Sequence, residues 1–200
     1  MNSNQDYFIK KLEIDVNQPS PIMLRYSRYH ILDLFRELDF KVGAEIGTEH
    51  GIYAEKLCSK NSQLKLFCID PWIASTYYHE ETKQEVMDGL YQEAKNRLSK
   101  YNCEILKMTS MEAVKLFKLN SLDFVFIDGN HNFEFVKDDI SSWSKIVRPG
   151  GVVYGHDYWG NNDVKQAVDG FMETSKIKPW FKLHRGGYMI PCWMYFRENR

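Results

Sequence analysis

Short apolar runs alternate with helix-like stretches along this 200-residue chain, and no other feature constrains its fold as strongly. The runs are typical of buried strands: KVGAEIG (41–47), KLFCID (65–70), CEILKM (103–108), LDFVFID (122–128) and GVVYGHD (151–157). Stretches with apolar residues three and four positions apart separate them, which is the helical period. Continuous apolar strands joined by helices indicate a mainly parallel sheet with helices on both faces.

The last two apolar runs differ from the others because no helix lies between them. They are WFKLHR (180–185) and YMIPCWMYF (188–196), and they meet at Gly186-Gly187, which predicts an antiparallel hairpin. The expected fold is therefore α/β: a Rossmann-like, doubly wound, seven-stranded and mainly parallel sheet that ends in an antiparallel hairpin strand. Residues 1–24, with QPSP at 18–21, are interpreted as a loosely packed leader, and residues 25–200 as one domain.

Two of the expected helices have a clear inner face. In residues 81–101 the inner positions are Val86, Leu90, Ala94 and Leu98. In residues 132–147 they are Phe133, Val136, Ile140, Trp143 and Val147. A short helix at 110–117 is expected to begin with Ser110 as its cap.

Composition excludes several classes of protein. With 26 basic and 27 acidic residues the formal charge is −1, so nothing indicates a broad nucleic-acid surface. No apolar run is long enough for a signal peptide or a membrane span. The four cysteines form no C-x-x-C pair, which favours a reducing compartment. We therefore expect a soluble, cytoplasmic protein with neither nucleic-acid nor membrane partners.

Polar residues follow four of the strands where they end. The first strand leads into Glu45-Ile-Gly47-Thr48-Glu49-His50-Gly51, and later strands end at Asp70, at Asp128 and at His156-Asp157. The carboxyl ends of parallel strands meet at one edge of a sheet, where ligands bind. Glycines let a ligand approach the backbone, and an acid ending the next strand can hold a ribose diol.

The first loop does not suit a dinucleotide in either its glycine spacing or its charge. The first loop is not G-x-G-x-x-G, and Glu45 and Glu49 would repel phosphates. A cofactor with ribose, adenine and a positively charged amino-acid end fits better, and S-adenosylmethionine is such a molecule.

The segments VGAEIGTEHG, FCIDPW, LDFVFIDGNHNFEFVKDDI and VRPGGVVYGHDY together resemble a class I S-adenosylmethionine-dependent methyltransferase. The resemblance covers roughly residues 40–197 and is strongest to the branch with a G-x-x-x-G first loop and an IDG-x-H motif, which includes O-methyltransferases of sugars and natural products. It implies a cofactor site in which Glu45, Gly47, Thr48 and Gly51 line the methionine end, and Asp70 with Pro71 and Trp72 takes the ribose. Ser110 and Met111 would lie beside adenine, and Asp128 would face the amino group or a metal.

Methyl transfer to a hydroxyl usually needs a base, and histidine suits this role near neutral pH. His131 and His156 are the candidate bases, with Asp128 beside them. The alternatives are a helix-start residue for His131 and a hydrogen-bonded buried histidine for His156. The resemblance also implies a divalent metal held by Asp128, Asp157 and His156. Because Mg²⁺ prefers oxygen ligands, the histidine would favour a transition metal.

The acceptor is expected to be a small hydroxylated molecule, with glycosides and nucleotide sugars as candidates, because the charge is balanced. Residues 76–84, with Tyr77, Tyr78 and His79, and residues 159–162 are candidate loops over the site. A homo-oligomer is left open. Two other functions are weighed: a cofactor-binding regulatory or scaffold protein without catalysis, and a nicotinamide-dependent oxidoreductase, which the missing pyrophosphate loop disfavours.

Overall fold

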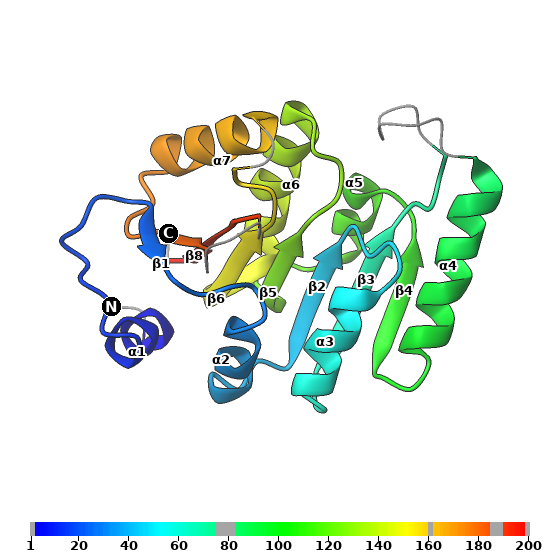
Figure 1. The fold of residues 1–200 in the computed structure, drawn as a ribbon, viewed down its shortest axis with the longest axis horizontal. Coiled ribbons are helices and arrows are strands. Elements are labelled where there is room, and N and C mark those ends of the chain that lie inside the picture. Colours follow the sequence, from blue (N-terminus) through cyan, green and yellow to red (C-terminus); the bar gives the residue numbers. More distant parts are fainter. Residues whose placement is uncertain (1–2, 75–82, 160–161, 185–189, 199–200) are drawn as a thin grey trace.

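The chain forms one mixed sheet of eight strands in the order β1-β7-β8-β6-β5-β2-β3-β4 (Figure 1). The computed structural model describes residues 3–74, 83–159, 162–184 and 190–198. All neighbouring strands pair in parallel except β8, which is antiparallel to β6 and β7. The strands are β1 Ile22–Leu24, β2 Val42–Ile46, β3 Lys65–Asp70, β4 Cys103–Lys107, β5 Leu122–Ile127, β6 Val147–Gly155, β7 Phe181–Leu183 and β8 Cys192–Phe196.

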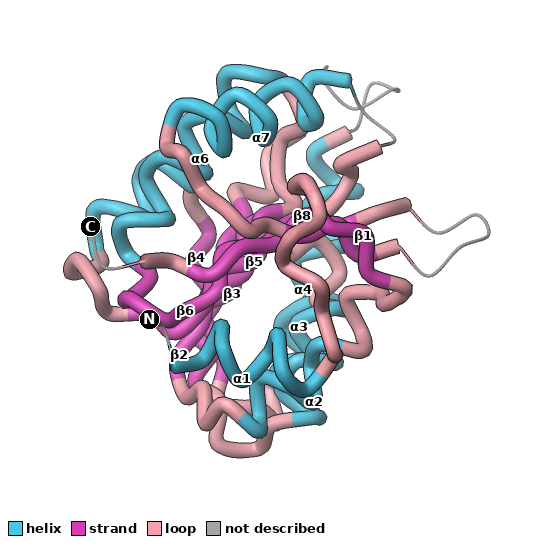
Figure 2. The backbone as a smooth tube through the Cα atoms, turned by 90° about the vertical axis from the view of Figure 1, so that its left-hand side faces the viewer, coloured by secondary structure: helices cyan, strands magenta, loops and turns pink. Residues whose placement is uncertain are grey.

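Helices cover both faces of this sheet. Figure 2 shows α6 and α7 on one face and α1, α2 and α3 on the other. The helices are α1 Ser3–Lys11, α2 Ile31–Glu37, α3 Ile52–Lys60, α4 Gln84–Leu98, α5 Ser110–Ala113, the 3₁₀ turn η1 Val114–Leu116, α6 Phe133–Ile146 and α7 Asn162–Thr174. The expected Rossmann-like, doubly wound arrangement is confirmed.

The last four residues of β5, Phe124–Ile127, are all apolar because both faces of the strand are covered. Phe124 and Phe126 point into the core beneath α1, α2 and α3, whereas Val125 and Ile127 point into the core beneath α6 and α7. Side chains alternate between the two faces of a strand, so a central strand between two helix layers is apolar at every position.

The expected C-terminal hairpin is also confirmed. Phe181 pairs with Met194 and Leu183 with Cys192 in antiparallel register. Pro191 lies directly before β8, where it interrupts no ladder hydrogen bond. The glycines expected at its turn lie outside the described residues.

The N-terminal segment differs from the expected loosely packed leader. Phe8 of α1 is 0% exposed, and its ring lies 5.1 Å from that of Phe181 and 5.2 Å from that of Phe196. Strand β1 pairs with β7, Ile22 opposite Phe181, and so adds an eighth strand to the seven expected. A three-residue strand is too short to be recognised from its period. The division of the chain at residue 24 stays a prediction.

Helix α4 is shorter than expected, and its inner face is rotated. Met87, Ala94 and Leu98 are buried, but Val86 is 52% exposed, so its assignment to the inner face was wrong. The reason is that Val86 lines a cleft, described below, rather than the core. The cap of α5 was also assigned wrongly: Thr109 is the N-cap, and it forms a capping box with Glu112.

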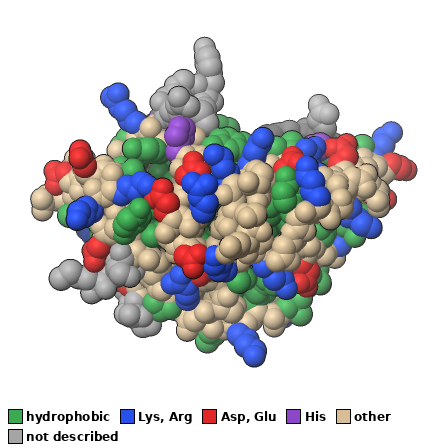
Figure 3. Space-filling model, turned by 90° about the horizontal axis from the view of Figure 1, so that it is seen from below, with side chains coloured by type: hydrophobic (Ala, Val, Ile, Leu, Met, Phe, Trp, Pro, Cys, Tyr) green, Lys and Arg blue, Asp and Glu red, His purple; other side chains and the backbone are tan. Residues whose placement is uncertain are grey.

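The face of the molecule seen in Figure 3 carries acidic and basic side chains interspersed with one another. Within the described ranges, every helix is too short or too polar to cross a bilayer.

Candidate active site at the carboxyl edge of the sheet

The sheet register brings the polar strand ends into one row. Ile46 of β2 lies opposite Ile69 of β3 and Ile127 of β5, and Ile127 lies opposite Gly155 of β6. The residues that follow these positions therefore meet at the carboxyl edge, as the sequence predicts: they are Gly47, Asp70, Asp128 and His156.

Gly47 opens the loop between β2 and α3 and touches the neighbouring strand end. Its φ is +85°, and a Cβ at this position would lie 2.1 Å from the carbonyl oxygen of Asp128. Any side chain would therefore push the two strand ends apart. Only glycine combines this close approach with this backbone conformation. Gly51, at φ +72°, is the N-cap of α3 and closes the same loop.

Asp70 ties this loop to the segment after β3. Its two carboxylate oxygens accept hydrogen bonds from the backbone N–H of Glu49 (3.0 Å) and of Trp72 (2.8 Å). The indole of Trp72 donates in turn to the carbonyl oxygen of Glu49 (3.0 Å). Burial raises the pKa of Asp70, and the two backbone donors oppose that shift. Asp70 thus fixes both loops around the cleft.

A cleft of about 560 Å³ lies at this edge. Its volume is within the roughly 300–1,000 Å³ of small-molecule sites. It is bordered by the loop after β2, the ends of β3 and β5, and one side of α4: Gly47, Glu49, His50, Asp70, Val86, Met87, Leu90, Asp128, Gly129 and His131. Three of the predicted cofactor residues, Gly47, Asp70 and Asp128, line it.

Other predicted cofactor residues lie beneath the cleft. Glu45 and Thr48 are 1% and 4% exposed, and atoms Glu45 Oε2 and Thr48 Oγ1 form no hydrogen bond with the described residues. Burial raises the pKa of Glu45 well above its usual range, which favours the protonated form of the carboxyl group. Buried polar atoms without partners are rare in native structures. These two are therefore available to a bound polar group or water.

Trp72, predicted beside the ribose, is 0% exposed and packs on the ring of Tyr91, 5.0 Å away. It supports the cleft from below, and the preceding residue, Pro71, is half-buried.

Ser110 and Met111, predicted beside adenine, are engaged with α6. Ser110 donates to Asp139 and accepts from the indole N–H of Trp143 (2.7 Å), while Met111 accepts from Ser142. Neither lines the cleft. Burial raises the pKa of Asp139 to about 7. The sequence carried a signal for Asp139, which we missed: it is an acid on the same helical face as Val136 and Trp143.

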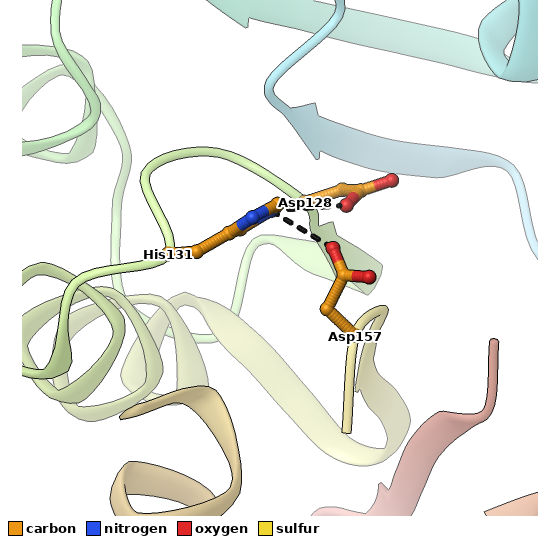
Figure 4. A group of neighbouring side chains, drawn as sticks. All are labelled: Asp128, His131 and Asp157. Atoms are coloured by element: carbon orange, nitrogen blue, oxygen red, sulfur yellow. Dashed lines mark ion pairs between the residues drawn. The ribbon is translucent and has the colours of Figure 1, made fainter. Parts of the chain in front are cut away.

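Asp128, His131 and Asp157 form a tight cluster beside the cleft (Figure 4). His131 Nε2 lies 3.0 Å from Asp157 Oδ2 and 3.6 Å from Asp128 Oδ1. This nitrogen is buried but lacks the alignment of a hydrogen bond to the described residues. One ligand atom from each residue lies within 4.8 Å of the other two.

Two further cations surround Asp128. His156 Nδ1 lies 3.5 Å from Asp128 Oδ1 and from Asp157 Oδ1. Arg28, which follows β1, donates through Nη1 to Asp128 Oδ2 at 3.0 Å. Nothing in the sequence around Arg28 indicates this contact, since 100 positions separate the two residues.

These contacts change the acid–base properties of the cluster. Burial alone would raise the pKa of Asp128, but His131, His156 and Arg28 hold it well below the usual range. Asp128 raises the pKa of His131 against the effect of burial. Burial would lower the pKa of His156, but Asp128 and Asp157 together raise it to about 9. The two carboxylates therefore stabilise the protonated form of both imidazoles.

The donor set fits a divalent cation. Two carboxylates and one imidazole converge, and the imidazole nitrogen is buried without a hydrogen bond. Such a mixed set suits Mn²⁺, Fe²⁺ or Zn²⁺ better than Mg²⁺, which prefers oxygen ligands. The sequence predicted Asp128 and Asp157 with His156, whereas His131 lies closest to Asp157. Which imidazole is the ligand stays a prediction.

Of the candidate loops over the site, Tyr77, Tyr78 and His79 lie outside the described residues, as do positions 160–161. Trp159 is described and is 66% exposed, with Lys182 Nζ 3.4 Å from the centre of its ring.

A family model described as "Methyltransferase domain" matches residues 44–158, which is more than half of the chain. The chain belongs to this methyltransferase family. The match spans the strand ends that border the cleft, from the loop after β2 to the residues after β6.

One curated relative of this methyltransferase domain is the protein named "Uncharacterized protein y4gI" of Sinorhizobium fredii. It is 27% identical over 120 residues, which are 56% of this chain but only 12% of y4gI. This chain thus corresponds to a small part of that protein's length.

The fold of the methyltransferase domain is shared with solved O-methyltransferases. The enzyme TomG of Streptomyces achromogenes, solved with SAM, has a TM-score of 0.63 at 16% identity over 98% of this chain and 89% of its own. An O-methyltransferase of Bacillus cereus, solved with SAH, has 0.60 at 17% identity over 98% and 91%. The O-methyltransferase NovP has 0.65 at 14% identity over 86% and 78%. At these identities the likeness concerns the fold.

Proposed function

We propose that this protein is an S-adenosylmethionine-dependent O-methyltransferase of a small hydroxylated acceptor, such as a sugar-containing molecule or another natural product. The observation that carries the proposal is that Asp128 and His131, two members of the cluster with Asp157, line the same cleft as Gly47 and Asp70. Membership of a methyltransferase family supports it. So does the fold shared with O-methyltransferases that were solved with SAM or SAH.

Each part of the cleft suits one part of the cofactor. Asp70 keeps carboxylate lone pairs beyond its two backbone donors and can accept the ribose hydroxyls. The bare backbone at Gly47 allows the methionine end to approach the strand ends. Asp128 carries the negative charge that an ammonium group needs, because its pKa is held low. The protonated Glu45 beneath the loop can donate to the cofactor's carboxylate or to a bridging water.

In the proposed reaction an acceptor oxygen forms a bond to the methyl carbon, and the sulfur–methyl bond breaks with its electron pair passing to sulfur. The hydroxyl proton leaves to an imidazole in its neutral form. Nε2 of His131 is the candidate nearest the cleft while no ion is bound to it, and His156 is the second candidate. A divalent ion, when bound, supplies Lewis acidity that lowers the pKa of a hydroxyl. Asp128, Asp157 and one of the two imidazoles would hold it.

Calorimetry tests the cofactor. We expect the purified protein to bind S-adenosylmethionine and S-adenosylhomocysteine, and Asp70→Asn to weaken both by roughly tenfold, because a charge-assisted hydrogen bond to ribose is lost. A folded protein that binds neither compound would refute the proposal. Val16→Ala, at an exposed position far along the chain from the cleft, serves as the control.

Mass spectrometry of glycosides, nucleotide sugars and phenolic acids incubated with the cofactor tests turnover. Cofactor binding without methylation of any acceptor would instead favour the scaffold function weighed above. Full activity after treatment with EDTA would exclude an essential ion.

A further inference from the structure

A second cavity, of about 200 Å³, lies next to the cluster and is separate from the cofactor cleft. Residues from the segment after β1, from the end of β6 and from the terminal hairpin line it, among them Arg28, Tyr29, His156, Leu183, His184 and Cys192. Arg28 and His156 both contact Asp128, which lines the cofactor cleft. Asp128 and its two partners therefore form the partition between the two cavities.

This position suits an acceptor. A methyl group must pass from the cofactor to an oxygen held in line with it, so donor and acceptor sites must meet at a shared wall. The shared wall here is formed by Asp128, Arg28 and His156, and His156 is one of the two candidate bases. With about 200 Å³, the cavity is smaller than the roughly 300 Å³ at which drug-sized sites begin. It therefore fits one substituted ring rather than a polymer.

The lining of the second cavity contains a guanidinium and two imidazoles but no carboxylate among the described residues. Arg28 has five N–H donors, of which one is bonded to Asp128. Its guanidinium carbon lies 4.9 Å from the ring centre of Tyr53 and 5.5 Å from that of Phe126. Stacking on these rings fixes the group before any ligand arrives, which lowers the entropic cost of binding.

We propose that this cavity receives the acceptor and selects one that carries a carboxylate near the hydroxyl to be methylated. Arg28 binds that carboxylate, and His184 contacts it from the wall formed by the end of β7. Guanidinium and carboxylate match in shape and charge, and the pairing is stronger in a partly buried site than in water. Hydroxybenzoates and uronic acids are acceptors of this class. The inference rests on the proposed function for the direction of methyl transfer, but not for the binding of the anion.

Two ligands of similar shape, one charged and one neutral, test whether the second cavity prefers a carboxylate. We titrate the protein with 3,4-dihydroxybenzoate and with the corresponding benzamide, each with and without S-adenosylhomocysteine. The acid is expected to bind at least tenfold more tightly than the amide. In turnover, glycosides of a uronic acid are expected to exceed those of the neutral hexose in kcat/KM, mainly through a lower KM.

Substitutions in the lining of the second cavity test which residues cause the preference for the acid. Arg28→Gln and His184→Gln should each lower the affinity for the acid by about tenfold while changing that for the amide by less than about threefold. Arg36→Gln is the control, because it removes one positive charge from exposed Arg36 on α2, which does not line the cavity. Circular dichroism verifies folding. Arg28→Gln removes an ion-pair partner of Asp128 and could prevent folding. In that case His184→Gln alone tests the preference for the acid, because His184 forms no ion pair with Asp128.

Equal affinity for acid and amide would overturn the inference, as would a preference that survives both substitutions. Failure of the protein to bind S-adenosylhomocysteine would instead overturn the proposed function, since the titration without cofactor still measures the anion preference. The two failures are therefore distinguishable.

Discussion

Gly47 and Asp128 are in contact through their backbones, and a Cβ on Gly47 would lie 2.1 Å from the carbonyl oxygen of Asp128. The two residues end neighbouring strands, and the N–H of Asp128 donates to the carbonyl of Ile46 at 2.9 Å. This contact brings the loop after β2 next to the acidic cluster. The cleft therefore requires a residue without a Cβ at position 47.

Gly47→Ala is expected to lower the free energy of unfolding by about 2–3 kcal/mol and to weaken cofactor binding, because a φ of +85° is strained for alanine and the opposing atoms are backbone. Chemical denaturation and calorimetry measure the two effects. Gly170→Ala is the matched control. A Cβ at Gly170 in α7 would meet no atom within 4 Å, so this change should stabilise the protein by about 0.5–1 kcal/mol. Equal effects of the two substitutions would contradict the prediction.

Asp139 makes stability depend on pH. Its folded pKa, about 7, is raised from an ordinary value of 3.8. The folded protein therefore holds a proton that the unfolded chain has released, and stability falls as pH rises between these values. The slope is at most roughly 1.4 kcal/mol per pH unit, and above pH 7 it levels off.

Asp139→Asn keeps an oxygen that can accept from Ser110 but cannot ionise. We expect the stability of this variant relative to the parent protein to increase from pH 5 to pH 7 and then stay constant, as measured by urea denaturation at a series of pH values. Glu134→Gln removes an exposed charge from the first turn of the same helix and is the control. A difference between variant and parent that does not change with pH would show that Asp139 is ionised throughout.

Metal binding should distinguish the two histidines near Asp157. His131 is the imidazole grouped with Asp128 and Asp157, whereas His156 lies 3.5 Å from both carboxylates and faces the second cavity. We expect Mn²⁺ to bind more tightly than Mg²⁺. His131→Ala should weaken Mn²⁺ binding by more than tenfold and by clearly more than His156→Ala, because only the former removes a ligand. Calorimetry with the bare ions measures this, and the reverse order would assign the ligand to His156.

Phe8→Ala tests how firmly the N-terminal segment is packed. Phe8 is fully buried against Phe181 and Phe196, so its loss is expected to lower the free energy of unfolding by about 3–5 kcal/mol. Phe135→Ala makes the same chemical change at a site on α6 that is 51% exposed, and it should cost about 1 kcal/mol or less. If Phe8→Ala were as mild as its control, the segment would be as loosely attached as its sequence indicated.

The sequence predicts the sheet well because the same pattern recurs at each central strand. Each central strand is a continuous apolar run followed by polar residues, and parallel strands must present those residues at one edge. The sequence therefore predicts a group of four polar residues, and the structure brings them together: Asp128, His131, His156 and Asp157.

Two kinds of information were not accessible from the sequence. Arg28 reaches Asp128 across 100 positions, and no local pattern encodes such a contact. An apolar stripe on a helix also does not reveal what it faces: Val86 and Met87 both line the cleft, but only Met87 is also buried in a core cluster. Asp139 is different, because the sequence does indicate it: a carboxylate among the apolar positions of α6 conflicts with burial of that face.

The pairing of β1 with β7 has a consequence for synthesis of the chain. Residues 22–24 emerge from the ribosome long before residues 181–183, with which they pair. Until then β1 has no neighbour in the sheet, because β7 is the only described strand it pairs with. Arg28 follows β1 by four positions, so the guanidinium that contacts Asp128 is secured only when the last strands dock. Arg28 is thus synthesised 100 residues before Asp128. It is positioned against Asp128 only after the last strands have docked, so the protein would gain its full chemistry in the final step of folding.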